Sequence, residues 1–146
     1  MKKITAALCL LLILTLAACG QGGDTAPETT APAATRPYEA LMLADIASAT
    51  VEVMPPHVTV ELDADTIAEL VALLQTVEIY GKDPSNEAFG GQAVIYTLTK
   101  TDGSVEKIIH YSDFAYINGI KYHAEPGPYE ALSLLGNTLA GTRFGE

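Results

Sequence analysis

The chain has 146 residues, and its 18 acidic and 8 basic side chains give it a formal net charge of −10. This length fits one domain with a hydrophobic core of its own. A surface of that charge repels phosphate groups, so nucleic acid and anionic lipid head groups are poor partners, and nucleic-acid binding is excluded from the expected functions. The acidity keeps a small domain soluble, and cationic ligands are the minority alternative.

The N-terminal segment has the pattern of an export signal. Lys2 and Lys3 precede an apolar run from Ile4, which ends in Leu16-Ala17-Ala18-Cys19. This pattern resembles the lipobox signal of the bacterial lipoprotein class. The resemblance implies that residues 1–18 are removed as a signal peptide and that Cys19 becomes the diacylated first residue. It also implies a location at the cell membrane, anchored by lipid and facing the extracytoplasmic side.

Two other interpretations of this segment are an ordinary secretory signal, cut near Ala17 and Ala18, and an uncleaved membrane anchor. About 15 apolar residues fall short of the roughly 20 that a helix needs to cross a bilayer, which argues against an anchor. An ordinary cleavage leaves a single thiol at Cys19, which is unusual in exported proteins. Two acyl chains on one cysteine are enough for stable membrane attachment.

The mature chain that this signal implies has no available thiol. Cys9 leaves with the signal peptide and Cys19 is acylated, so no disulfide, zinc–thiolate site or cysteine nucleophile is expected. Loss of Lys2 and Lys3 leaves six basic side chains against 18 acidic ones, a formal charge of −12. The stability of the domain must therefore come from its hydrophobic core.

Residues 19–37 have the composition of a flexible tether. This stretch consists mainly of Gly, Ala, Thr, Pro, Gln and acidic residues, with scarcely an apolar side chain larger than alanine. Such a segment cannot bury enough surface to become ordered. Flexible-chain scaling gives it a reach of roughly 20 to 25 Å. We expect a disordered tether over residues 19–37 and a single folded domain over residues 38–146.

The first part of the domain predicts two strands and a helix. Residues 38–46 fit either a short helix or an irregular lead-in, whereas Ala49–Val53 and His57–Leu62 have strand character and are separated by two prolines. Asp63 stands at an N-cap position and predicts a helix over Ala64–Thr76. Its apolar residues have helical spacing, at Ile67, Leu70, Val71 and Leu74.

A long polar loop is predicted after a short strand at Val77–Tyr80. The loop spans Gly81–Gly91 and is either an ordinary surface connection or a functional one. Asp83, Asn86 and Glu87 offer oxygen ligands, but they lack the spacing and central glycine of a calcium-binding EF-hand loop. No metal site is expected in this loop.

Two β-hairpins follow, because Asp-Gly and Asn-Gly each stand between alternating apolar residues. The first joins Gln92–Thr99 to Val105–Tyr111, and the second joins Ala115–Ile117 to Ile120–Tyr122. If both turns contain two residues, Tyr96 faces Ile109, Val94 faces Tyr111, Ile95 faces His110 and Tyr116 faces Lys121. Tyr96, Tyr111 and Tyr122 are then core residues. A bulged turn would shift one strand by one residue.

The chain closes with a predicted helix over Tyr129–Ala140, after Pro126-Gly127-Pro128. Gly136 weakens this helix by roughly 1 kcal/mol relative to alanine. The element order β-β-α-β-β-β-β-β-α predicts an α+β fold, with a mainly antiparallel sheet and both helices packed on one face. The hairpins and the closing helix also resemble the small lipoproteins of bacteria with a single membrane.

The predicted register gathers aromatic, histidine and lysine side chains on one face of the sheet. Tyr116 pairs with Lys121, Phe114 and His123 lie beyond them, and His110 reaches the same side. Such a surface suits contact with a protein, a peptide or a glycan. With one loop residue included, the candidate binding surface consists of Phe89, His110, Phe114, Tyr116, Lys121 and His123.

No catalytic residue, cofactor or metal is predicted. Ser112 lies between His110 and Asp113, but neighbours on a strand point to alternate faces and cannot converge as a triad. We therefore expect a non-enzymatic binding or regulatory module held at the membrane by Cys19. Two alternatives stay open: an envelope enzyme with site residues drawn from His110, Asp113 and His123, and a structural lipoprotein that self-associates through an edge strand.

Overall fold

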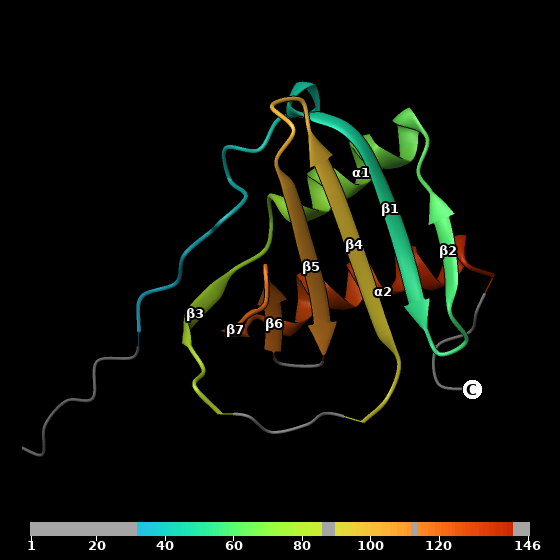
Figure 1. The fold of residues 1–146 in the computed structure, drawn as a ribbon. Helices are drawn as coiled ribbons and strands as arrows, with labels where there is room; N and C mark the ends of the chain where they lie inside the picture. Colours follow the sequence, from blue (N-terminus) through green and yellow to red (C-terminus); the bar gives the residue numbers. More distant parts are fainter. Residues whose placement is uncertain (1–31, 86–89, 112–113, 142–146) are drawn as a thin grey trace, which may run out of the picture. The chain divides into compact units, whose positions relative to one another are not determined.

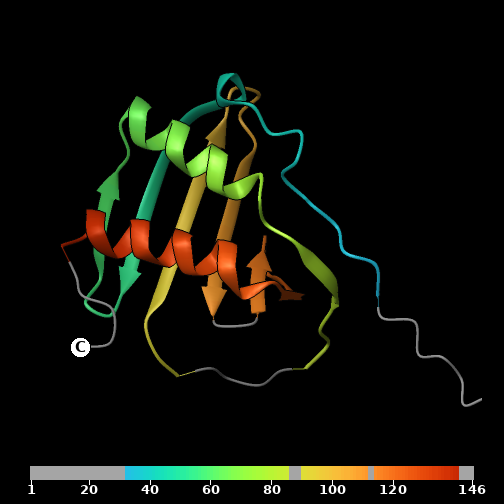
Figure 2. The same ribbon diagram turned by 180° about the vertical axis from the view of Figure 1, so that it is seen from behind.

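The computed structural model describes residues 32–85, 90–111 and 114–141. These residues form a seven-stranded antiparallel sheet, in which the strand order is β2-β1-β4-β5-β6-β7-β3. Both helices cover one face of the sheet and leave the opposite face without a helix (Figures 1 and 2). The predicted α+β class and element order are confirmed.

The elements follow one another with short connections, except between β3 and β4. Residues 38–46 were expected to form either a short helix or an irregular lead-in. The structure has a short 3-10 turn there, η1 (Leu43–Asp45), which leads into the sheet. The strands and helices are β1 (Ile46–Met54), β2 (Val58–Glu61), α1 (Ala64–Leu74), β3 (Ile79–Lys82), β4 (Ala93–Lys100), β5 (Val105–Tyr111), β6 (Phe114–Ile117), β7 (Ile120–Ala124) and α2 (Pro126–Leu139).

Helix α1 begins where the sequence predicts. The Asp63 carboxylate accepts a hydrogen bond of 2.8 Å from the Thr66 amide, and this bond lowers the pKa of Asp63. The helix ends at Leu74, two residues before the predicted end, because the Val77 amide donates to the Leu74 carbonyl and turns the chain toward β3. The four predicted apolar residues are all buried.

Helix α2 begins at Pro126, three residues before the predicted start at Tyr129. Proline fits the first helical position because its fixed φ suits a helix and the amide it lacks would have no partner there. The inner side of α2 contacts the middle of the sheet, where Tyr96 donates a hydrogen bond of 2.7 Å to the Leu132 carbonyl. The core between helices and sheet includes Val51, Val53, Leu70, Leu74, Tyr96, Leu98, Ile108, Tyr129 and Leu132.

The β4–β5 hairpin differs from its predicted register by one residue. Tyr96 pairs with Ile108 and Val94 pairs with His110, so the predicted pairs were wrong. The Lys100 amide donates to the Ser104 carbonyl at 2.8 Å, so the turn contains three residues instead of two. Gly103 adopts a φ of 84°, as the bulged form of such a turn requires. The shift moves every β5 side chain to the face opposite the predicted one.

The β6–β7 hairpin has its predicted register. Ile117 pairs with Ile120, Ala115 with Tyr122 and Tyr116 with Lys121. Asn118 and Gly119 both have positive φ values, 52° and 81°, which fits a two-residue turn matched to the twist of the strands. Ala115 is fully buried, so Phe114 and Tyr116 lie on the helix-free face.

The two edges of the sheet differ. At the β3 edge, Thr35 exchanges two backbone hydrogen bonds with Ile79, at 2.8 and 2.9 Å, and Arg36 forms an ion pair with Glu78. Thr35 and Arg36 lie within the predicted tether, residues 19–37, so the last residues of that range belong to the fold. At the β2 edge no described residue pairs with the outer side of the strand.

Candidate functional site

The helix-free face presents a group of rings over β5, β6 and β7. We call this group the aromatic surface and define it as Tyr111, Phe114, Tyr116 and His123. Tyr111 pairs with Phe114 across β5 and β6, and Phe114 pairs with His123 across β6 and β7. The three aromatic residues are half-buried and His123 is exposed. The aromatic surface therefore combines apolar area with contact to solvent.

The rings of the aromatic surface contact one another. Tyr111 and Tyr116 meet edge to face, with centroids 6.1 Å apart and planes at 81°. Phe114 and His123 have centroids 4.9 Å apart with planes at 45°. Contacts of this geometry hold rings in place, so a partner would meet side chains that are already positioned.

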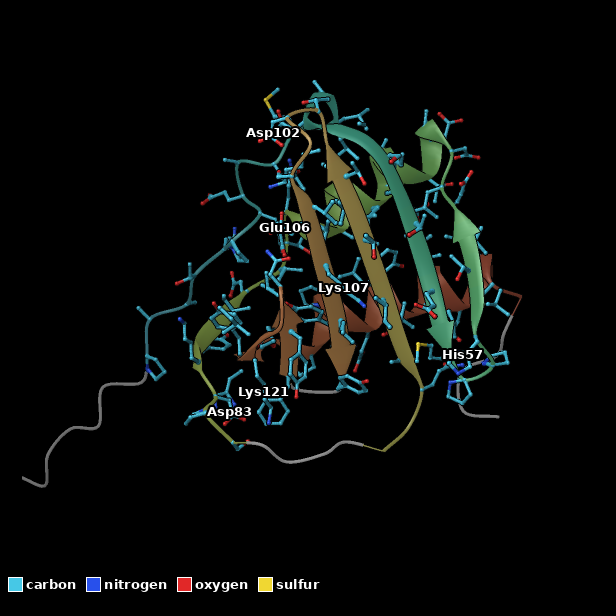
Figure 3. All side chains as sticks on the ribbon, viewed as in Figure 1. His57, Asp83, Asp102, Glu106, Lys107 and Lys121 are labelled. Carbon is cyan, nitrogen blue, oxygen red and sulfur yellow. The ribbon has the colours of Figure 1, made fainter. Side chains whose placement is uncertain are left out.

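Lys121 belongs to the same face but is buried, although the sequence placed it on an exposed surface. Its side chain is 4% exposed and its Nζ lies 2.7 Å from an Asp83 carboxylate oxygen. The ammonium also donates to the Ser85 hydroxyl at 2.8 Å and lies 4.1 Å from the centroid of the Phe114 ring. Figure 3 shows Lys121 and Asp83 side by side. The prediction that Lys121 is available to a partner was wrong.

The cluster of Asp83, Ser85 and Lys121 has the residue types of a serine nucleophile with a lysine base. A lysine base must be uncharged to accept the serine proton. Here the hydrogen bond from Lys121, together with the Ser85 amide, lowers the pKa of Asp83 to about 2. The same carboxylate forms an ion pair with Lys121, whose Nζ lies 2.7 Å from it. The contacts therefore fasten the start of the β3–β4 connection to β7.

His110 lies on the helix-covered face, and its predicted place on the helix-free face was wrong. The one-residue shift in the β4–β5 turn is the cause. The imidazole stacks on Tyr129 of α2, with centroids 4.7 Å apart and planes at 7°. Its Nδ1 lies 3.0 Å from the Ser133 hydroxyl, which is itself buried. His110 therefore joins α2 to β5.

The same shift brings Tyr111 onto the aromatic surface, where the sequence had not placed it. The signal was present, since Gly103 in a Thr-Asp-Gly-Ser turn also suits a three-residue loop with a positive φ. Phe89, Asp113 and Cys19 lie outside the described residues. The structure thus brings together Phe114, Tyr116 and His123 from the candidate set, with Lys121 buried beneath Phe114 and His110 on the other face.

No group of three or more His, Cys, Asp or Glu side chains within residues 32–85, 90–111 and 114–141 is arranged to hold a metal ion. His110 and His123, both considered for an enzymatic site, point to opposite faces of the sheet. Opposite faces of a sheet cannot supply two groups to one reacting atom.

Neither helix in the described part of the chain has the length and apolar character needed to cross a membrane. Comparison with models of protein families, with curated proteins and with solved structures finds no match to this chain.

Proposed function

We propose that this protein is a lipid-anchored extracytoplasmic module that binds a protein, peptide or glycan partner through the aromatic surface. The observation that supports the binding role is the helix-free face, on which Tyr111, Phe114 and Tyr116 are half-buried beside an exposed His123. Aromatic rings with a polar atom at one end are favoured in binding surfaces because they offer large contact area with few rotatable bonds.

The anchoring part of the proposal is supported by the lipobox pattern that ends in Cys19. We expect the wild-type chain to incorporate a labelled fatty acid and to be recovered in the membrane fraction of cells. A Cys19→Ser chain should incorporate no label and leave that fraction, since diacylation supplies the membrane affinity. Equal labelling of both chains would contradict lipid attachment at Cys19.

The binding part is tested by crosslinking in intact cells, followed by recovery of the anchored protein. The variant is the double substitution Tyr116→Ala, His123→Ala. The control is Thr97→Ala, Thr99→Ala, which alters the same face over β4, away from the aromatic surface. Both variants should first be shown to keep the thermal stability of the wild type. Isolated cell-wall material is included as a separate target, so that a glycan partner is distinguished from a protein.

We expect one crosslinked partner to be recovered with the wild type and the control, and to be reduced at least about tenfold with the double variant. If the double variant retains the partner, the aromatic surface is not the binding site. If neither target is recovered with any chain, the binding role itself is contradicted, and assays for enzyme activity become the next step.

A further inference from the structure

No described residue pairs with the backbone groups on the outer edge of β2. The Leu62 amide donates to the Ala49 carbonyl at 3.0 Å, so Leu62 and Ala49 are a hydrogen-bonded pair in register with the β1–β2 ladder. Because bonded and non-bonded pairs alternate, Val58 and Val60 direct their backbone groups toward β1. Thr59 and Glu61 then direct their N–H and C=O groups away from the sheet. This is the arrangement that an added strand requires.

The other edge of the sheet is covered by the chain itself at one residue of β3. Thr35 forms hydrogen bonds with the outward N–H and C=O groups of Ile79 on β3. Proteins commonly cover or charge their edge strands, which prevents unwanted pairing. Within the described residues, the β3 edge is covered at Ile79 and the β2 edge is covered at no residue, so the two edges are not equivalent.

The side chains of β2 suit an added strand. Val58 and Val60 are half-buried on the helix-covered side, where Val60 packs against the core. Thr59 and Glu61 are exposed on the helix-free side. A neighbouring strand with alternating side chains would extend the apolar row beside the valines and place its polar side chains beside Thr59 and Glu61.

Charge decides which strand can pair at this edge. Residues 37–81 contain eight acidic side chains and no lysine or arginine. Four of the eight lie in or beside β2: Glu52, which is opposite Thr59, and then Glu61, Asp63 and Asp65. The His57 Nδ1 lies 3.8 Å from a Glu52 carboxylate oxygen. A second copy of this chain would bring the same carboxylates against these, and like charges on paired strands are unfavourable.

We propose that the free edge of β2 accepts an extended basic segment of a partner protein by strand addition. Backbone hydrogen bonds to Thr59 and Glu61 would hold the segment in register, and the surrounding carboxylates would select lysine and arginine side chains. This interaction is separate from the aromatic surface, which lies over β5 to β7.

The test uses the full chain in detergent and a short fluorescent peptide of alternating lysine and valine. Hydrogen exchange of the Thr59 and Glu61 amides, followed by NMR, should slow at least about tenfold when the peptide is bound, whereas Val60 should change little because its amide already faces β1. A peptide with glutamate in place of lysine should bind at least about tenfold more weakly, and added salt should weaken the lysine peptide.

Thr59→Pro removes one outward N–H and should weaken the lysine peptide about tenfold or more, since proline is tolerated at a strand edge that faces solvent. Thr59→Ala keeps the N–H and should bind as the wild type does. If Thr59→Pro fails to fold, Glu61→Lys replaces it, and the preference for the lysine peptide over the glutamate peptide should fall.

Equal binding of both peptides, slowed exchange only at other amides, or no binding at millimolar peptide would each overturn the proposal. Slowed exchange at Thr59 and Glu61 that grows with protein concentration and needs no peptide would show a second copy as the occupant instead. Thr59→Pro should leave the crosslinked partner of the aromatic surface unchanged, so failure here is distinct from failure of the proposed binding site.

Discussion

Gly136 marks the closest approach of α2 to the sheet. A Cβ atom at this position would lie 2.4 Å from Val94 Cγ1 and 3.2 Å from the Tyr96 hydroxyl oxygen. Alanine favours a helix interior by about 1 kcal/mol over glycine. A side chain forced into a packed core costs about 1 to 3 kcal/mol, and these two atoms, like Val51 Cγ2 at 3.1 Å, belong to buried side chains.

We therefore expect Gly136→Ala to lower the free energy of unfolding by up to about 2 kcal/mol, measured by urea denaturation. Gly127→Ala is the matched control on the same helix, since no described heavy atom beyond its chain neighbours and the backbone of its own helix lies within 4 Å of the Cβ it would add. That variant should be as stable as the wild type or slightly more stable. Equal behaviour of the two variants would contradict the close approach.

Two buried tyrosines allow a comparison of hydroxyl groups. The Tyr96 hydroxyl donates to the Leu132 carbonyl, whereas the buried Tyr129 hydroxyl has no hydrogen-bond partner among the described residues. Burial raises the pKa of both phenols. We expect Tyr96→Phe to destabilise the fold by about 1 kcal/mol and Tyr129→Phe to have a smaller effect or a stabilising one. Thermal unfolding of the two variants checks this, and a larger loss for Tyr129→Phe would contradict it.

At the scale of the elements, one ion pair fastens the β3–β4 connection to β7. Asp83 and Lys121 have side chains 9% and 4% exposed, and the pKa of Asp83 falls from 3.8 to about 2. A carboxyl group with a lowered pKa in the folded state stabilises the fold above its ordinary pKa. That contribution is lost as the pH falls through the folded value. This stability is therefore lost as the pH falls from about 4 to about 2.

We expect the wild-type protein to lose stability across that window, as followed by urea denaturation at each pH. Asp83→Asn should lack this pH-dependent contribution. Its free energy of unfolding should therefore change less with pH, and should approach the wild-type value at the lowest pH. Lys121→Met removes the ammonium and should flatten the curve in the same way. Parallel curves for wild type and Asp83→Asn would show that another carboxylate controls stability in this range.

The sequence predicts the helices, strands and turns better than it predicts the face of the sheet on which each side chain lies. Asp63, the helical spacing after it and the Asn118-Gly119 turn are local signals, and each produces the structure it predicts. The β4–β5 turn is local too, but Asp102-Gly103 suits loops of two and of three residues. The loop length decides whether His110 or Tyr111 lies on the helix-free face, and the three-residue loop places Tyr111 there. No local pattern contains Lys121 and Asp83 together, so the burial of Lys121 could not be predicted.

At the scale of the whole molecule, the chain enters the domain along the β3 edge. The Thr35 amide donates to Ile79 at 2.8 Å, and the Ile79 amide donates back at 2.9 Å. We expect Thr35→Pro to remove the first bond and to speed hydrogen exchange of the Ile79 amide about tenfold or more, measured by NMR. Thr35→Ala keeps its N–H and should leave exchange unchanged. Unchanged exchange in both variants would mean that the pairing contributes no protection.

This pairing has a mechanical consequence under the proposed anchor at Cys19. Any pull between the membrane and a bound partner reaches the domain through residue 32, and so loads the bonds of Thr35 and the Arg36–Glu78 pair before it loads the sheet. These contacts can open while the β3–β7 ladder and the core stay closed. Their opening would release the chain from residue 32 up to Tyr38, whose side chain is 3% exposed in the core. The N-terminal entry would thus act as a force-sensitive extension, which yields under tension and re-forms when the tension ends.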